Sequence, residues 1–255
     1  MTINKKFNHF VPFINNDIIK HFYKVFALRY EDISHKKLVF SLKINNKKNS
    51  IISDKRLCVN ITNEHMLFSM LKFLFILKKD FSLDINIFYE YLQNKNIEKE
   101  TDFMILGIDL RENINDSRIK LYFKSKPFCF FNPSLFDIKN EFNIKNKKLI
   151  NQIEMLCIDL SFDGTHEFKY YCNIKDEKYK KDILSKFNFK DKTINTKNKM
   201  VAVFYSHGKV NFNVKVHDIY DVTKLGLNEK FNFYTKKYPI DYISISDDGQ
   251  LNIYF

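Results

Sequence analysis

The stretch "FMILGIDLRENINDSRIKLYFKSK", residues 103–126, has the pattern of two β-strands joined by a polar turn. In its second strand, Lys120, Tyr122 and Lys124 alternate with apolar side chains. Side chains of a strand point to opposite faces in turn, so one face is apolar and the other is cationic and phenolic. The fold class depends on whether this polar face meets solvent or an enclosed space.

The same pattern recurs along the chain. "ILGIDLR" (105–111) and "MLCIDLS" (155–161) share an I-D-L core, and each is followed by a turn-like stretch and a second strand. Asp-Gly or His-Gly between alternating strands is typical of a tight hairpin. Five hairpins are predicted, pairing 37–44 with 55–62, 103–111 with 118–126, 155–162 with 166–174, 200–206 with 210–219, and 241–246 with 250–255.

Segments with helical character lie between the hairpins. They cover residues 63–81, 83–95, 133–153, 175–187 and 221–237, and Thr62 or Asn63 is a candidate cap of the first. Large antiparallel sheets tend to curl or close, and closure removes exposed edges. The predicted fold is therefore α/β (α+β): a ten-stranded antiparallel β-barrel surrounded by α-helices, in one domain spanning residues 1–255. A two-layer fold with a solvated polar face is the alternative.

In a barrel wrapped by helices, the apolar faces of the strands pack outward and the polar faces point inward. The second strands of the hairpins would deliver polar side chains to one shared interior. These are Arg56, Cys58, Asn60, Lys120, Tyr122, Lys124, Lys169, Tyr171, Asn173, Asn211, Asn213, Lys215, His217, Asn252 and Tyr254. Several cations buried without a fixed carboxylate nearby would need a polyanion or water. The pattern therefore predicts a chamber for an anionic ligand.

The composition sets limits on the function. The chain has 42 basic and 30 acidic residues, a net charge of +12, which suits an anionic ligand and also fits a generally lysine-rich sequence. The 4 cysteines and 7 histidines show no metal-ligand spacing. No glycine-rich phosphate loop, G-x-S-x-G motif, signal peptide or membrane-spanning stretch is evident. A monomeric cytoplasmic protein that binds neither membranes nor nucleic acid is expected.

The segments "GIDLRENINDSRIKLYFKSK" (107–126) and "LCIDLSFDGTHEFKYYCNI" (156–174) resemble the cyanobactin prenyltransferases, which have the ABBA (ααββ) prenyltransferase barrel. The resemblance extends to "LVFSLKI" (38–44), "VKVHDIYDVTKLGLNE" (214–229) and "YPIDYISISDDGQLNIYF" (238–255), in order along the chain. It implies an enzyme that moves a dimethylallyl or geranyl group from its diphosphate to a side chain of a small, often cyclic, ribosomally derived peptide.

Such a reaction needs cations for the leaving diphosphate and neutral, electron-rich walls for the allylic cation. The predicted diphosphate-binding residues are Arg56, Lys120, Lys124, Lys169 and Lys215. The predicted prenyl pocket comprises Tyr122, Tyr171, Tyr254 and Phe204, although alternation does not decide whether Phe204 or Tyr205 points inward. No D-D-x-x-D motif is present, so Mg²⁺ is expected to be held by the diphosphate and not by the protein.

The chain departs from the pattern of the cyanobactin prenyltransferases at the position of the general base. Where the resemblance implies a glutamate in an L-E-x-S-x-K-I context, this sequence has Val39, which cannot accept a proton. Asp109 and His217 are the candidate catalytic residues, with Asp159 or the acceptor itself as alternatives. Asp109 and Asp159 occupy equivalent places in the I-D-L repeats, which also suits a structural task such as holding a lysine. A protein that binds without turnover is a further possibility.

A function of a different class also fits the pattern. Lysine and arginine interleaved with tyrosine on a sheet can neutralise and stack single-stranded nucleic acid. That function requires the basic face to be open to solvent, whereas prenyl transfer requires it to be enclosed.

Overall fold

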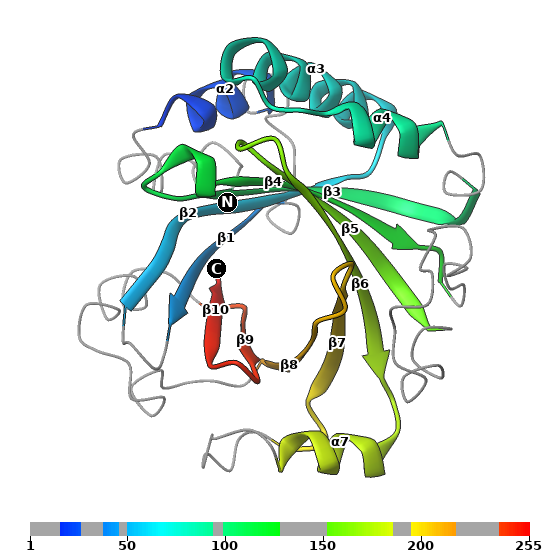
Figure 1. Ribbon diagram of the computed structural model, residues 1–255. Helices are drawn as coiled ribbons and strands as arrows, with labels where there is room; N and C mark the ends of the chain where they lie inside the picture. The colour runs from blue at the N-terminus through cyan, green and yellow to red at the C-terminus, as the bar shows by residue number, and fades with distance from the viewer. Residues whose placement is uncertain are drawn as a thin grey trace. The chain divides into compact units, whose positions relative to one another are not determined.

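The computed structural model describes residues 16–26, 38–45, 50–93, 99–127, 152–185, 195–217 and 240–255. Its ten strands are hydrogen-bonded in the order β1-β10-β9-β8-β7-β6-β5-β4-β3-β2, and the sheet is a closed barrel (Figure 1). The strand pairs are antiparallel for β1–β10, β10–β9, β2–β3, β3–β4, β6–β7, β7–β8 and β8–β9. The predicted fold class is confirmed.

All five predicted hairpins are present. The strands are β1 (Leu38–Asn45), β2 (Ser50–Ile61), β3 (Thr101–Leu110), β4 (Arg118–Ser125), β5 (Ile153–Ser161), β6 (His166–Ile174), β7 (Lys199–Tyr205), β8 (Val210–Val216), β9 (Tyr242–Ser246) and β10 (Gln250–Tyr254). The last three hairpin turns contain Gly164, Gly208 and Gly249 at φ 85°, 87° and 86°. Glycine adopts this left-handed conformation without a steric penalty, which explains why the sequence predicts these turns.

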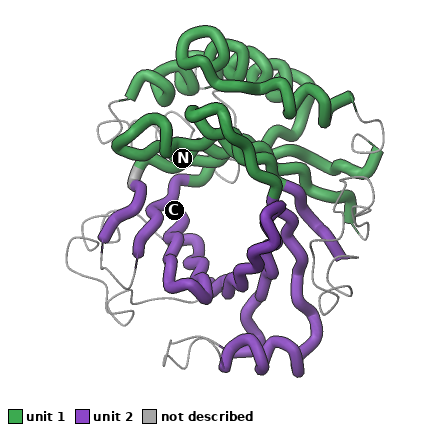
Figure 2. The backbone as a smooth tube through the Cα atoms, viewed as in Figure 1, with its two compact units in different colours: residues 1–39, 55–129, 157–168 green, residues 40–54, 130–156, 169–255 purple. Residues whose placement is uncertain are grey.

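The chain divides into two compact units (Figure 2). Unit 1 comprises residues 1–39, 55–129 and 157–168, and unit 2 comprises residues 40–54, 130–156 and 169–255. The single domain spanning the whole chain stays a prediction.

In unit 1, helices cover the apolar face of the sheet (Figure 1). They are α2 (Asp17–Phe26), α3 (Glu64–Phe81) and α4 (Asn86–Leu92). The Phe88 ring of α4 lies 6.4 Å from the Phe123 ring of β4, and the Phe22 ring of α2 lies 5.7 Å from the Phe73 ring of α3. Asn63 caps α3 by accepting from the backbone N–H of Met66. Helix packing on Phe123 leaves Lys120, Tyr122 and Lys124 on the opposite face.

Two of the predicted helices correspond to α3 and α4, whereas α2 was not predicted. In unit 2, α7 (Glu177–Leu184) matches the predicted helix at 175–187 and is capped by Asp176. Its Tyr179 ring lies 6.3 Å from the Phe212 ring of β8, so α7 packs against the apolar face of this unit's strands. The predicted helices at 133–153 and 221–237 lie mostly or wholly outside the described residues.

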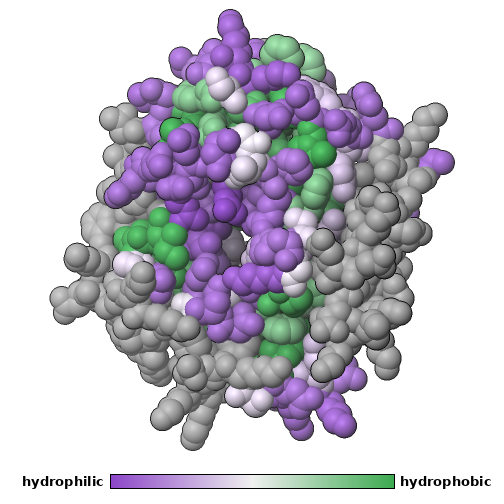
Figure 3. Space-filling view, in the orientation of Figure 1, coloured by the Kyte–Doolittle hydropathy of each residue, from purple (hydrophilic) through white to green (hydrophobic). Residues whose placement is uncertain are grey.

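Figure 3 shows one face of the molecule, on which hydrophilic residues cover most of the described surface. Two large apolar side chains of α3 are exposed: Phe68 is 63% exposed and Phe75 is 62% exposed. Within the described ranges, none of the helices has the length and apolar character needed to cross a membrane.

Candidate functional site

The polar face of unit 1 consists of rows of side chains on neighbouring strands. Arg56 of β2 pairs with Asp109 of β3, which pairs with Arg118 of β4. The next row joins Cys58, Gly107 and Lys120, and the row after that joins Asn60, Ile105 and Tyr122. Residues two apart along a strand share a face, so antiparallel pairing brings these side chains to one surface.

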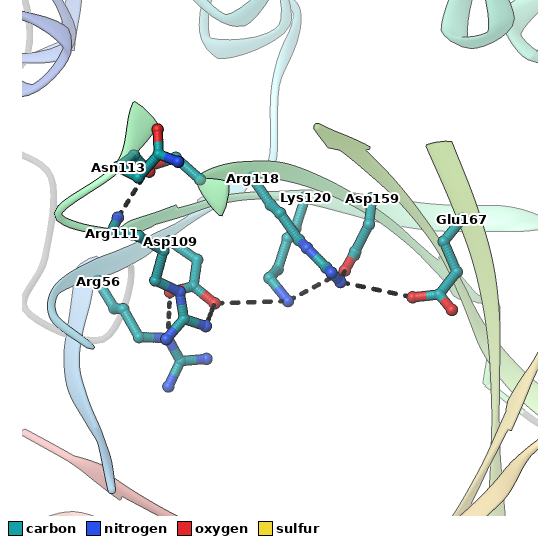
Figure 4. Close-up of polar contacts among 9 residues, drawn as sticks. Arg56, Asp109, Arg111, Asn113, Arg118, Lys120, Asp159 and Glu167 are labelled. Carbon is teal, nitrogen blue, oxygen red and sulfur yellow. Dashed lines mark hydrogen bonds and ion pairs between the residues drawn. The ribbon is translucent and has the colours of Figure 1, made fainter. Parts of the chain in front are cut away.

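Asp109 is surrounded by three cations (Figure 4). Its Oδ2 accepts a hydrogen bond from a terminal guanidinium nitrogen of Arg111 at 3.0 Å and lies 3.8 Å from Lys120 Nζ. Its Oδ1 lies 3.4 Å from Arg56 Nε. The Asp109 side chain is only 2% exposed. A buried carboxylate is tolerated here because cations neutralise it.

Asp159 of β5 collects a second set of partners on the same face. Its Oδ2 accepts from Lys120 Nζ at 3.2 Å and lies 3.5 Å from a guanidinium nitrogen of Arg118. Its Oδ1 accepts from the Cys157 thiol at 3.1 Å. Arg118 also lies 3.5 Å from Glu167 Oε2 of β6. Lys120 therefore links the two aspartates of the repeated I-D-L cores, which confirms the expectation that these aspartates hold a neighbouring lysine.

These contacts correct one expectation. Cations without a fixed carboxylate nearby were predicted, but Arg56 and Lys120 both have buried aspartates as partners. Four cations, Arg56, Arg111, Arg118 and Lys120, here called the cation cluster, face three carboxylates, Asp109, Asp159 and Glu167. The formal charges of these seven side chains sum to 4 − 3 = +1. The carboxylates keep the cations together while leaving an excess of positive charge.

Arg111 and Arg118 were not predicted as site residues. Arg111 follows the end of β3, and Arg118 is the first residue of β4. Alternation with Lys120 and Tyr122 could have placed Arg118 on the polar face. Burial lowers the pKa of the Arg111 guanidinium, repulsion from Arg56 and Arg118 lowers it further, and Asp109 raises it. Repulsion among these guanidinium groups favours binding of a further anion.

Gly107 leaves room in the middle of this face. A Cβ atom built on it would lie 3.2 Å from Lys120 Cβ, 3.3 Å from Tyr122 Cε2 and 3.4 Å from Cys58 Sγ. The Tyr122 ring therefore lies against β3 at Gly107, beside Lys120. Burial raises the pKa of the Cys58 thiol, while the charges of Arg56 and Lys120 lower it. Lys124 lies on the same face of β4, two residues beyond Tyr122.

Unit 2 carries its own cations on a polar face. Lys169 is 6% exposed, and its Nζ lies 5.1 Å from the centre of the Tyr205 ring. Tyr205 pairs with Lys169 in the sheet, whereas Phe204 pairs with Tyr170 and is 1% exposed on the opposite, apolar face. Phe204 was therefore the wrong choice for the polar pocket, and Tyr205 is the residue that points to that face. Tyr171 lies on the face of Lys169, two residues along β6.

A second group in unit 2 is aromatic. The Tyr242 and Tyr254 rings stack at 4.2 Å with an interplanar angle of 15°. Lys215 Nζ lies 4.8 Å from the centre of the Tyr242 ring, and the His217 ring lies 5.4 Å from it. His217 follows the end of β8 and is exposed, so it is not a strand residue as predicted. Tyrosine faces that already attract an ammonium group could equally stabilise another cation.

The candidate positions for the general base have different surroundings. Val39 lies in β1 two residues before Ser41 and therefore on the face of Ser41 and Lys43. Asp109 is engaged by three cations, Arg56, Arg111 and Lys120. His217 contacts Tyr242, and its ring is open to solvent.

No group of three or more His, Cys, Asp or Glu side chains among the described residues has an arrangement that could hold a metal ion. Asp109 and Asp159 are instead occupied by Arg and Lys side chains. These protein residues do not suit a metal site of their own.

A closed ten-stranded antiparallel barrel with helices on its apolar face is the ABBA prenyltransferase fold. The profile of a family described as a family of unknown function (DUF5838) matches residues 58–247. The chain belongs to this family. No curated protein matches the chain.

Solved structures of similar fold are known. The 5-dimethylallyltryptophan synthase from Streptomyces coelicolor has a TM-score of 0.53 at 9% identity, covering 87% of this chain and 81% of that chain. The 6-dimethylallyltryptophan synthase from Micromonospora olivasterospora, in complex with DMASPP and Trp, has a TM-score of 0.53 at 12% identity, covering 87% and 82%. NotF, in complex with brevianamide F and DMSPP, has a TM-score of 0.54 at 14% identity, covering 88% and 81%.

Proposed function

We propose that this chain is a prenyltransferase that moves a dimethylallyl or geranyl group from its diphosphate to a side chain of a ribosomally derived, cyclic peptide. The cation cluster, on the polar face of an ABBA barrel sheet, carries the proposal. Two of the similar structures were solved with DMASPP or DMSPP, which supports a prenyl diphosphate as the donor. The resemblance to cyanobactin prenyltransferases supports the peptide acceptor.

In the proposed reaction the C1–O bond of the donor breaks and its electron pair passes to the diphosphate. The acceptor atom then forms a bond to C1 and gives up its proton to a general base or to water. The cation cluster, which includes Arg56, is proposed to stabilise the charge on the leaving group, together with Lys124, Lys169 and Lys215. Tyr122, Tyr171, Tyr205 and Tyr254 are proposed to shield the allylic cation. That the polar faces of both units line one chamber stays a prediction.

Mass spectrometry tests the proposal. The protein is incubated with dimethylallyl or geranyl diphosphate and a panel of cyclic peptides and tryptophan, because one similar structure holds Trp. The expected result is a mass gain of one prenyl group on a peptide. Parallel reactions with Mg²⁺ and with EDTA test the prediction that Mg²⁺ accompanies the diphosphate. No mass gain on any acceptor, with no binding of either donor, would refute prenyl transfer.

Binding assays on the same protein distinguish this proposal from the alternative functions. Donor binding without transfer would identify a family member that binds without turnover. Oligonucleotide binding that weakens steeply with salt, without binding of allylic diphosphates, would identify a nucleic-acid-binding protein. Cytoplasmic localisation and a monomeric state stay predictions.

Val39→Glu is expected to create or increase transfer to a hydroxyl-bearing peptide. A glutamate at this position would supply the base that the resemblance to cyanobactin prenyltransferases implies there, and general-base catalysis contributes about 10²-fold or more. The readout is the transfer rate with Tyr, Ser and Thr peptides. Val39→Gln has nearly the same shape without a base and should give no gain. Equal rates in the two variants would place the base elsewhere.

A further inference from the structure

Lys120 is held differently from the arginines of the cation cluster. Its Nζ lies between two carboxylates, 3.2 Å from Asp159 Oδ2 and 3.8 Å from Asp109 Oδ2. The two aspartates come from different strands and are 1% and 2% exposed on their side chains, while the lysine side chain is 12% exposed. Figure 4 shows Lys120 midway between them, with all three side chains on one side of the sheet.

An arginine can serve a carboxylate and an anionic ligand at once, because its planar guanidinium has five N–H donors in a rigid fork. Arg56 and Arg111 each lie near one carboxylate through one nitrogen, and Arg118 lies near two carboxylates, those of Asp159 and Glu167, through one terminal nitrogen. In Figure 4 the guanidinium of Arg56 extends past Asp109, away from the sheet. A lysine ammonium has three donors at a single point, and two carboxylates already share that of Lys120.

We propose that Lys120 is an internal counter-ion and not a ligand cation, and that Arg56, Arg111 and Arg118 are the members of the cation cluster that contact the diphosphate. Lys120 is thus a positioning residue: it neutralises Asp109 and Asp159 together, so that each aspartate can orient its arginine. This inference rests on the proposed function, and it replaces the direct diphosphate contact that the sequence predicted for Lys120. The ligand class it defines is a diphosphate recognised by paired guanidinium forks.

The charge balance makes the proposal testable. With four cations and three carboxylates the wild-type cluster sums to +1. Lys120→Met lowers the summed charge to 3 − 3 = 0 and removes one cationic partner from each buried aspartate. Adding Asp159→Asn gives 3 − 2 = +1, the wild-type sum, and the amide oxygen can still accept from Cys157. A counter-ion should become dispensable once its carboxylate is neutralised, whereas a ligand cation should not.

The experiment compares the wild type, K120M, D159N, K120M/D159N and, as control, K126M, which removes a lysine that is exposed on the same unit. Thermal unfolding and calorimetric titration with inorganic diphosphate are measured for each. K120M is expected to lower Tm and to raise Kd about tenfold or more. The double variant is expected to recover Tm and to bring Kd back to within about threefold of wild type. K126M should change neither quantity.

Two outcomes would overturn the inference. Recovery of Tm with a Kd that stays high would make Lys120 a ligand cation, and an unrecovered Tm would mean that Lys120 and Asp159 are not coupled. If the wild type transfers prenyl groups in the mass assay, either result leaves the proposed function standing. If the wild type binds no diphosphate at all, that result would refute both the proposed contacts of the arginines and the proposed function.

Discussion

Replacing Asp109 by alanine is expected to lower the free energy of unfolding by about 3–5 kcal/mol, the usual cost of removing one partner from a buried ionic network. Three cations, Arg56, Arg111 and Lys120, would lose their shared carboxylate on a face where Asp109 is 2% exposed. The measurement is equilibrium unfolding in urea, followed by far-UV circular dichroism.

Asp163→Ala is the control for this prediction. Asp163 lies in the β5–β6 turn, is exposed, and accepts hydrogen bonds from the backbone N–H and hydroxyl of Thr165. Its loss should cost far less stability than the loss of Asp109. Equal losses in the two variants would contradict the idea that Asp109 organises the cation cluster.

Arg56→Ala is expected to raise the Kd for inorganic diphosphate about 10- to 100-fold. Hydrogen bonds to charged groups contribute about 1.5–3 kcal/mol, and each 1.4 kcal/mol corresponds to a factor of ten. The fold should persist, because Asp109 keeps Arg111 and Lys120 as partners in the absence of Arg56. Isothermal titration calorimetry gives the affinity, and thermal unfolding checks the fold.

Lys55→Ala is the matched control for Arg56→Ala. Lys55 precedes Arg56 on β2 and pairs with Leu110, so its side chain lies on the opposite face of the strand. The substitution therefore removes one positive charge from that opposite face. Its Kd should stay within about twofold of wild type, as expected for a rim charge that makes no ligand contact. An unchanged Kd in the Arg56 variant would remove Arg56 from the site.

The sequence predicted the cationic faces but not the pairings within them. Lys120 and Tyr122 were assigned to the polar face of β4 by alternation alone, and the packing of Phe123 on helix α4 confirms that face. Alternation could not choose between Phe204 and Tyr205, because the two residues are both aromatic and stand at the end of β7. The pairing of Lys169 with Tyr205 in the sheet decides it.

The aspartates show the limit of local pattern more clearly. The repeated I-D-L cores indicated equivalent structural places for Asp109 and Asp159, which are 50 residues apart in the chain. Nothing in either repeat indicates that both carboxylates reach the same lysine, or that Arg111 and Arg118 join them at the turn. These contacts depend on strand register across β2, β3, β4 and β5.

What the sequence determined by itself was the set of hairpins and the polar or apolar character of each strand face. Both follow from local physics: glycine permits the tight turns, and side chains alternate with a period of two. Only the tertiary structure decided which charges neutralise one another. Ion pairing falls off over a few ångströms, so the partners of a buried cation are set by how strands distant in sequence align, and no single segment contains that information.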